Sequence, residues 1–571
     1  MLSVVLDDDF VMTRIVKFYK LIKFLFSLLL IPGLHTDAMC QQAYSCLPEG
    51  IVFSRQGQID SFLIRYPGCT RLTGSVTISG PDITNLNGLK NLHTIGGELQ
   101  IAGNNLLQSV MGLESLDSIN GNLKINSNLA LESIEGLSNI IHIDGNIEIM
   151  NNPMLFNLKG ISIDSIRGTF MLQGNNALMN LTGLESLVHI ERNFHISTNN
   201  TMTSLSGADA LQIIGGSFTI ENNINLTSFG RFTLDSILGN LIVAYNANLP
   251  DFRGLDELRY IKGDFHISRN ATMEDLRGLD ALHGIGGNLN ISYNNALINI
   301  SGFISLVTIQ GDLKLSGNNT LKRLSGLRSL KHISGNFLLD GNSSLVDLSD
   351  LKSLEAIGGK MTIVGNGGLF DFTGLQSLTF LGGDLSISNN TDLASLDGFD
   401  SLRILKGALM IFNNSKLHDL RGLDQINHDS LQDIVIENSI ALSDCAIQSI
   451  CKYLAGSKHV QVSNNAVGCN SPEEVAGTCQ TNAMDASVEN KIMLYPDPAS
   501  GSIYIKGHTA GIVSVSITTI DGFPIKKWDH PKKQIDLSQL ADGMYILNIQ
   551  QQKTVQVKRI IKHQSKISIV Y

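Results

Sequence analysis

The sequence is poor in charged residues, in aromatic residues and in long apolar runs, and each shortage excludes a class of protein. Charged residues make up 16% of the 571 positions, against roughly 25% in ordinary soluble domains. This composition excludes a coiled coil and a solvated disordered chain. The net charge of −10 offers no basic surface for nucleic acid. At this length we expect at least two structural units.

The amino-terminal residues carry an export signal. Basic residues from Arg14 to Lys23 precede an apolar run over residues 24–34, and a small residue, Ala38, follows. This order predicts a cleaved signal peptide over residues 1–38, with Met12 as the true start. A membrane anchor is the alternative, but the apolar run is about 11 residues long and a span needs about 20. We therefore expect no transmembrane span in the mature chain.

Cysteine is absent from residues 70–444 and occurs only on either side of them. The seven cysteines are Cys40, Cys46, Cys69, Cys445, Cys451, Cys469 and Cys479. Export favours disulfides, and Cys46–Cys69 is the expected first bridge. A short helix over residues 444–454 would turn Cys445 and Cys451 to different sides, so each should pair with Cys469 or Cys479 in an order left open. A metal site is the alternative for these four, although no Cys-x-x-Cys pair supports it. Cys40 is left without a partner.

A glycine recurs before an apolar residue at a nearly constant spacing through the middle of the chain. From Gly88 to Gly422 the fourteen steps are 24 residues in twelve cases and 23 in two. Each period contains a short alternating segment, such as residues 289–291, that predicts a strand with one face inward. The remaining apolar spacing fits tight bends or 3₁₀ turns and leaves no room for a long helix. The sequence predicts an all-β parallel solenoid of about 15 coils.

Two further columns of residues recur with this period. Fourteen successive coils carry an asparagine three residues after an inward aliphatic residue, namely Asn104, Asn128, Asn152, Asn175, Asn199, Asn223, Asn246, Asn270, Asn294, Asn318, Asn342, Asn366, Asn390 and Asn414. A side-chain amide supplies a donor and an acceptor where the chain bends, and stacked amides can pair along the solenoid axis. A glycine column that includes Gly97, Gly121 and Gly145 predicts a bend with positive φ.

The repeated Leu-x-Ile-x-x-Asn core resembles leucine-rich repeats and, more closely, the receptor L-domain over residues 72–440. The resemblance implies a right-handed solenoid whose short strands lie about 4.8 Å apart. A solenoid needs capped ends. We expect the cysteine-bearing segments 39–71 and 441–479 to be disulfide caps, the second with a helix start at Ser471 and Glu474.

The period ends after residue 479. Residues 480–491 are polar and predict a linker, and residues 492–571 alternate as separate strands at 502–506, 513–520, 544–550 and 555–561. Asp521-Gly522 predicts a tight hairpin. This pattern is typical of a small antiparallel sandwich of the immunoglobulin-like kind.

Four ordered motifs in these last residues resemble the type A sorting domain of the type IX secretion system. They span residues 494–501, 520–522, 535–545 and 558–561, and their marker residues are Tyr495, Pro496, Pro498, Gly501, Asp521, Gly522, Gly543 and Tyr545. The sequence departs from the family at Asp497, where Asn is usual, and in its extension 563–571. The resemblance implies export by the outer-membrane secretion machinery to the cell surface or beyond, in a bacterium of the Bacteroidetes kind. A plain immunoglobulin-like adhesion module is the alternative.

No residue pattern predicts catalysis, a cofactor or a metal site. The fourteen histidines are dispersed, and no phosphate-binding GxxxxGK[ST] loop occurs. The regular coils also leave no inserted loops to build the groove of a β-helix polysaccharide-active enzyme. We therefore expect no catalytic residue, no cofactor and no metal.

The outward positions of the predicted strands are small, polar and varied, which suits a broad contact surface better than a pocket. One feature differs: Tyr245, Arg269 and Tyr293 occupy the same position in three successive coils. Two aromatic rings flanking a guanidinium are suited to hold a sugar, a peptide or a carboxylate. A surface stack that satisfies itself is the alternative. We expect a secreted or surface-anchored binding protein with a glycan or protein ligand, and a structural rod without a specific ligand as the alternative.

Overall fold

A computed structural model describes residues 44–456, 460–484, 493–495, 499, 501–506, 512–529, 534–551 and 554–562, to which all structural statements here refer. The predicted signal peptide, Cys40, Pro496, Pro498 and the extension 563–571 lie outside these residues.

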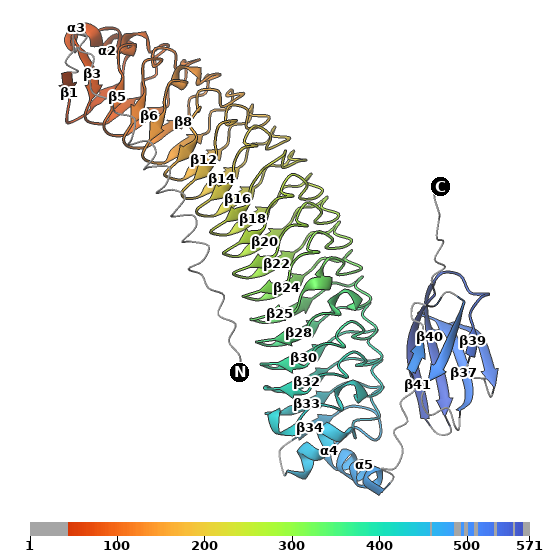
Figure 1. Ribbon diagram of the computed structural model, residues 1–571. Helices are drawn as coiled ribbons and strands as arrows, with labels where there is room; N and C mark the ends of the chain where they lie inside the picture. The colour runs from red at the N-terminus through yellow and green to blue at the C-terminus, as the bar shows by residue number, and fades with distance from the viewer. Residues whose placement is uncertain are drawn as a thin grey trace, which may run out of the picture. The chain divides into compact units, whose positions relative to one another are not determined.

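The middle of the chain is a parallel β-solenoid in which every coil adds one strand to a large sheet. Each strand pairs in register with the strand one coil later, so that Ile267 lies beside Ile291 and Ile291 beside Leu315. Figure 1 shows the strands stacked in one series from β6 to β34. The eighteen strands are β2 (Ile51–Phe53), β4 (Val76–Ile78), β6 (Leu99–Ala102), β8 (Leu123–Asn126), β10 (Ile147–Met150), β12 (Phe170–Gln173), β14 (Phe194–Ser197), β16 (Phe218–Glu221), β18 (Leu241–Ala244), β20 (Phe265–Ser268), β22 (Leu289–Ser292), β24 (Leu313–Ser316), β26 (Phe337–Asp340), β28 (Met361–Val364), β30 (Leu385–Ser388), β32 (Leu409–Phe412), β33 (Ile434–Glu437) and β34 (Val460–Ser463).

A second side of the coils carries shorter parallel strands. They form one sheet of β1 (Tyr44–Cys46), β3 (Cys69–Leu72), β5 (Thr94–Ile95), β7 (Ser118–Ile119) and β9 (His142–Ile143), and another of β11 (Ser165–Ile166), β13 (His189–Ile190), β15 (Ile213–Ile214), β17 (Ser236–Ile237), β19 (Tyr260–Ile261), β21 (Gly284–Ile285), β23 (Thr308–Ile309), β25 (His332–Ile333), β27 (Ala356–Ile357), β29 (Phe380–Leu381) and β31 (Ile404–Leu405). Some coils turn through a 3₁₀ helix, namely η1 (Asn87–Leu89), η2 (Glu135–Leu137), η3 (Leu327–Ser329), η4 (Ser349–Leu351), η5 (Arg421–Leu423) and η6 (His428–Ser430). The two readings of the three-residue apolar spacing, bends and 3₁₀ turns, therefore both occur.

The core follows from strand alternation and coil register. In β22 Leu289 and Ile291 are fully buried, while the residues between and after them point outward. Register also stacks like side chains, since the rings of Phe170, Phe194 and Phe218 lie parallel with centroids 5.3 and 5.1 Å apart. Each coil thus buries its apolar face against the coils on either side of it.

The predicted asparagine column is a continuous buried ladder. All fourteen side chains are 0% exposed. The amide N–H of Asn294 donates to Oδ1 of Asn318 over 3.0 Å, and its Nδ2 donates to the carbonyl of Ile267 over 3.1 Å. The ladder continues beyond the predicted column, because Asn414 donates to Oγ of Ser439.

The prediction of positive φ at Gly97, Gly121 and Gly145 is wrong. None of them has a positive φ. Instead the coils approach too closely for a side chain there: a Cβ on Gly121 would lie 2.6 Å from the backbone of Gly97. Left-handed backbone occurs at other positions, among them Gly302, with φ 129.

Both ends of the solenoid are capped by short helices and disulfides. The first cap holds α2 (Gln56–Asp60) and α3 (Phe62–Arg65), and the second holds α4 (Gln448–Ala455) and α5 (Pro472–Met484). The helix predicted from residue 444 begins only at Gln448, because the backbone of Asp444 forms a parallel β-bridge with that of Asp419 in the preceding coil. Helix α5 continues to Met484, into the segment predicted as a linker. The caps also supply β2 and β34, which is why the strands outnumber the predicted coils.

The last part of the chain is a small antiparallel sandwich. One sheet holds β35 (Met493–Tyr495), β36 (Ser502–Lys506) and β39 (Gln534–Asp536), and the other holds β37 (Ile512–Thr519), β38 (Pro524–Asp529), β40 (Gly543–Gln551) and β41 (Thr554–Lys562). Buried residues from both sheets, such as Ile503 and Leu547, form one core separate from the core of the solenoid. The four strands predicted from alternation correspond to β36, β37, β40 and β41.

Candidate functional site

A column of left-handed residues runs along the large sheet. In sixteen coils the residue after the strand, directly before the ladder position, has φ between 54 and 70. We call these residues the left-handed column: Gly103, Ser127, Asn151, Gly174, Thr198, Asn222, Tyr245, Arg269, Tyr293, Gly317, Gly341, Gly365, Asn389, Asn413, Asn438 and Asn464. Five are glycine and six are asparagine, the residue types that adopt this conformation most readily.

Tyr245, Arg269 and Tyr293 are the large side chains of this column, and they are consecutive. Their φ values are 57, 55 and 58. A left-handed backbone costs a residue with a Cβ about 1–2 kcal/mol. Since Gly or Asn meets the backbone requirement in most coils, the solenoid does not need large residues at these three positions. Unfavourable backbone conformations of this kind concentrate at functional sites.

The three side chains form an exposed stack. The guanidinium carbon of Arg269 lies 5.3 Å from the ring centroid of Tyr245 and 5.0 Å from that of Tyr293. The two tyrosines remain 45% and 51% exposed. Among the described residues no acidic side chain forms an ion pair with Arg269, whereas Arg253 and Arg277 each bind an aspartate two residues away. The stack therefore presents a guanidinium whose charge has no carboxylate partner.

Gly317 makes room for one edge of the stack. A Cβ on Gly317 would lie 2.7 Å from both Cδ1 and Cε1 of Tyr293. The next member of the column, Gly341, has a similar φ, but a Cβ there would meet nothing closer than 4.0 Å. The ring of Tyr293 thus leans across the following coil and covers the end of its strand.

Small residues form a floor beside the stack. The last residues of β18, β20, β22 and β24 point outward, yet Ala244, Ser268, Ser292 and Ser316 are at most 5% exposed. Ser388 occupies the same position in β30, next to Asn389, and is only partly buried. The floor residues are thus more buried than Ser388, although Ser197 at the same position in β14 is also only 5% exposed.

Two polar atoms of this floor have no partner. Oγ of Ser316 and Oδ1 of Asn290 are inaccessible to solvent, and neither forms a hydrogen bond within the described residues. Both side chains project from the outward face, because the intervening Leu289, Ile291 and Leu315 point into the core. A buried polar atom without a partner costs about 1–3 kcal/mol, and a side-chain rotation that brings the atom to the outward face would let a ligand recover this cost.

Charge around the stack is one-sided. The outward strand positions of β18, β20, β22 and β24 include Lys314 and His266 and no acidic residue, and the first acidic side chains in these columns are Glu221 and Asp340, in the flanking strands. Burial is the main cause of a lowered pKa at His266; Lys314 and Arg269 lower it further, while Glu221 and Asp264 raise it. The ring Nε2 of His266 lies 2.7 Å from Oγ of Ser268. The outward positions of these four strands thus hold basic and neutral side chains, with one acidic side chain in each flanking strand.

We name this surface the stack patch: Tyr245, His266, Arg269, Asn290, Tyr293, Lys314 and Ser316. The sequence identified Tyr245, Arg269 and Tyr293 as a candidate site, and the register of the coils brings them together. It did not identify Asn290, Ser316 or Gly317. The recurrence of Gly and Asn before each ladder asparagine was the available signal, since it marks the positions where a large residue is strained.

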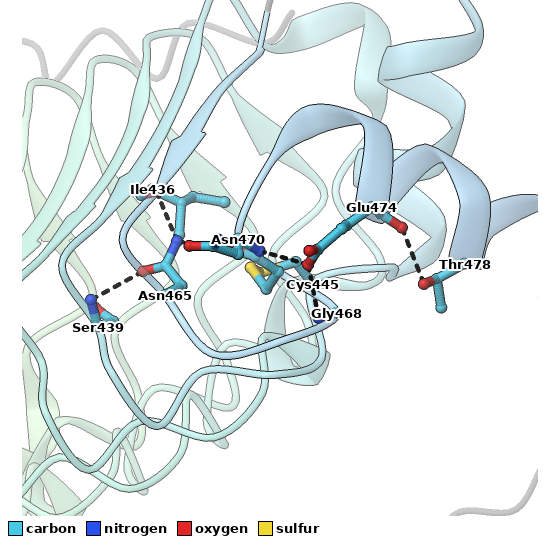
Figure 2. Close-up of a disulfide and its surroundings, with 9 residues drawn as sticks. Ile436, Ser439, Cys445, Asn465, Gly468, Asn470, Glu474 and Thr478 are labelled. Carbon is cyan, nitrogen blue, oxygen red and sulfur yellow. Dashed lines mark hydrogen bonds between the residues drawn. A yellow bond between two sulfur atoms is a disulfide. The ribbon is translucent and has the colours of Figure 1, made fainter.

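The predicted disulfide residues lie in the caps. Cys46 pairs with Cys69, as the sequence favoured, and the order left open at the other end is Cys445 with Cys469 and Cys451 with Cys479. Figure 2 shows Asn465 and Glu474 around the Cys445 bridge. The Glu474 carboxylate accepts hydrogen bonds from the backbone N–H of Gly468 and of Asn470, over 2.8 and 3.1 Å. These contacts fix the loop that ends the ladder against the start of α5.

The predicted sorting-motif residues lie at turns and strand ends of the sandwich. Tyr495 ends β35, Gly501 directly precedes β36, and Gly543 begins β40. Asp521 and Gly522 form the turn between β37 and β38, where Gly522 has φ 85. The hydroxyl of Tyr545 donates to the carbonyl of Ala541 over 2.9 Å. These residues shape the sandwich.

The described part of the chain holds neither a cluster of metal-binding side chains nor a membrane-spanning helix. No group of three or more His, Cys, Asp or Glu residues there is arranged to hold a metal ion. Within the same residues, no helix combines the length and the apolar character needed to cross a bilayer.

Comparison with known families assigns both parts of the chain. Residues 68–162 match the receptor L domain, and residues 493–563 match the secretion system C-terminal sorting domain. No curated protein matches the chain. The receptor L-domain match covers the first coils, and the same period and ladder extend through the later ones. The chain is therefore a parallel β-solenoid that is similar to the receptor L domain over residues 68–162 and carries a type IX sorting domain over residues 493–563, the mark of proteins exported to the cell surface or outside the cell.

Proposed function

We propose that the chain is a secreted or surface-anchored binding protein that recognises its ligand on the outward face of the large sheet. In this proposal the sorting domain engages the secretion machinery of the outer membrane, and the solenoid acts by binding and not by catalysis. The observation that carries the proposal is the run of three large residues at strained positions of the left-handed column, where Gly or Asn serves most other coils.

The construction of the stack suits recognition. Backbone hydrogen bonds to the following coil hold its main chain. The N–H of Arg269 donates to the carbonyl of Ser292 over 3.2 Å, and the N–H of Tyr293 donates to the carbonyl of Ser316 over 2.9 Å. The side chains are therefore held in place before a ligand arrives. A surface ordered in advance loses little conformational entropy on binding, so more of each contact contributes to affinity.

A broad array of glycans and peptides, probed with the full chain, tests the proposal. We expect saturable binding to one ligand class and loss of that binding in Arg269→Asn, a residue that the column itself uses. Absence of binding across the array, with circular dichroism showing a folded chain, would favour a structural surface rod. Release of new reducing ends from an array polysaccharide would instead favour an enzyme.

Export is tested separately from binding. Deletion of residues 493–571 should leave the chain in the periplasm, and cell fractionation followed by protease accessibility would show its location. Surface delivery of the truncated chain would contradict a sorting role for this domain.

A further inference from the structure

We propose that the stack patch binds a carboxylate-bearing sugar residue, so that the ligand of this protein is an acidic polysaccharide. This inference rests on the proposed function and adds the ligand class to it. It is drawn from the charge, the available donors and acceptors, and the backbone pairing of the patch.

The charge of the patch selects an anion. Arg269 and Lys314 form no ion pair with an acidic side chain of the described residues, and the outward positions of four successive strands hold no carboxylate. Some lysines and arginines of the solenoid pair with Asp or Glu across coils, as Lys360 does with Asp384 at 2.6 Å, while Arg269 and Lys314 stay without such a pair among the described residues. A ligand carboxylate can therefore bind them without displacing one of the protein's own.

The surroundings of the Arg269 guanidinium favour a planar anion that binds along the edge of this group. The tyrosine rings of the preceding and following coils lie 5.3 and 5.0 Å from the guanidinium carbon and leave its other sides to a ligand. The N–H groups in the guanidinium plane are what remains for a ligand, and a carboxylate accepts two of them in parallel. A lysine at this position would keep the charge and lose this fit.

The side chains of Asn290 and Ser316 favour a ligand that also carries hydroxyl groups, provided that they rotate to bring their covered oxygen atoms to the outward face. Oδ1 of Asn290 accepts hydrogen bonds only, and Oγ of Ser316 can accept or donate. A simple anion offers acceptors and no donor for Asn290, whereas a sugar ring offers several hydroxyl groups beside its carboxylate. The apolar edges of the tyrosines add stacking surface for the ring.

The sheet disfavours a peptide as the occupant. Strands β18, β20, β22 and β24 pair along their length with the strands on both sides, which leaves no free edge for an added peptide strand. Ile242 and the small Ala244 are the two apolar residues among the outward positions of these four strands. The patch therefore lacks the apolar pocket in which a peptide side chain would anchor.

Affinity measurements on the full chain test the inference. The probes are polygalacturonate, a neutral galactan and poly-L-glutamate, compared in the same buffer at about 0.15 M salt so that long-range charge is screened. We expect polygalacturonate to bind about tenfold or more tightly than either other polymer. Equal binding of poly-L-glutamate would overturn the inference in favour of charge alone, and tighter binding of the galactan or of a peptide would overturn the ligand class while leaving a binding function in place. If none of these polymers and no member of the glycan and peptide array bound the chain, both the proposed binding function and the proposed ligand class would be wrong.

Two glycine variants link the binding to the patch without deleting a functional group. Gly317→Ala places a methyl group against the ring of Tyr293, whereas Gly341→Ala pays a similar backbone cost with open space around it. We expect Gly317→Ala and Arg269→Lys each to weaken polygalacturonate binding by about tenfold, and Gly341→Ala to leave it within about twofold. Equal affinities for the two glycine variants would contradict recognition at the stack patch. Because the matched pair shares its backbone strain, a loss confined to Gly317→Ala cannot come from general unfolding.

Discussion

The asparagine ladder and the left-handed column are neighbours in the chain, and they differ in what they tolerate. The ladder holds asparagine in fourteen successive coils, each fully buried. The left-handed column, one residue earlier, holds Gly, Asn, Ser, Thr, Tyr and Arg, and its side chains point to solvent. The fold therefore fixes the side chain in the ladder, but it fixes only the backbone conformation in the left-handed column. The residue type in the left-handed column is free to vary with function.

The physical reason is the number of bonds that each position must satisfy. In the ladder, Oδ1 of Asn294 accepts from both the N–H and the Nδ2 of Asn270, and its own Nδ2 reaches the carbonyl of Ile267. No other residue of similar size supplies those donors and that acceptor together. In the left-handed column the backbone makes the bonds between coils, and most side chains are not needed for them, although Asn413 and Asn464 also donate to the asparagine of the preceding coil.

The largest effect is expected in the ladder. Asn294→Ala should lower the free energy of unfolding by roughly 3–5 kcal/mol, because the buried N–H of Asn270 loses its acceptor and further bonds disappear with it. Asn295→Ala, on the exposed corner next to it, should change stability by less than about 0.5 kcal/mol. Denaturant unfolding compares the two. Similar losses would mean that the ladder does not hold the coils together.

The close approach of the coils gives the next largest effect. Gly302→Ala should cost roughly 2–3 kcal/mol, since its φ is 129 and its Cβ would lie 2.0 Å from the carbonyl oxygen of Leu276. Gly284→Ala is the control, because its φ is ordinary and its Cβ would meet nothing closer than 3.9 Å. Thermal unfolding of both variants tests this. A Gly302→Ala chain as stable as the Gly284→Ala chain would contradict the packing described.

Substitutions in the left-handed column should have a smaller effect, and of the opposite sign. Tyr245→Asn and Thr198→Asn should each keep or raise stability, by up to about 1 kcal/mol, because Asn adopts positive φ more readily. Loss of the contact with Arg269 offsets part of the gain at Tyr245. Chemical unfolding would measure both. If Tyr245→Asn alone lowered the free energy of unfolding by more than about 1 kcal/mol, the stack would be shown to stabilise the fold. Its strained backbone would then be no evidence for a binding function.

The smallest effect is expected from pH. Burial keeps the folded-state pKa of His266 below its ordinary value of 6.5, with Glu221, Asp264, Lys314 and Arg269 as the charged groups that act on it. The folded chain therefore binds fewer protons than the unfolded chain in mild acid, so this residue lowers stability as the pH falls below about 6.5 and has no effect well above it. The pH dependence of unfolding should be shallower in His266→Asn. An NMR titration that places the His266 pKa above 6.5 would reverse the expected sign.

The repeating parts of the molecule could be predicted from the sequence, and the single events could not. A residue such as Asn294 recurs at one spacing, so its burial and its bonds along the axis follow from the period alone. Gly121 recurs as well, but its spacing does not say whether it serves φ or the close approach of the next coil. The start of α4 depends on a single β-bridge between Asp419 and Asp444, and the burial of Ser316 depends on the orientation of the Tyr293 ring. Neither feature recurs along the chain, so the repeat period does not predict it.

Hydroxyl-radical footprinting of the full chain with polygalacturonate tests the central claim most directly, because it reads the ligand's position from side chains already exposed. Tyr245 and Tyr293 on the large sheet are 45% and 51% exposed, and Tyr260, on the second series of strands, is 54% exposed. The account predicts that the polymer slows oxidation of Tyr245 and Tyr293 and leaves Tyr260 unchanged. Equal protection of all three tyrosines, or of Tyr260 alone, would contradict recognition on the large sheet.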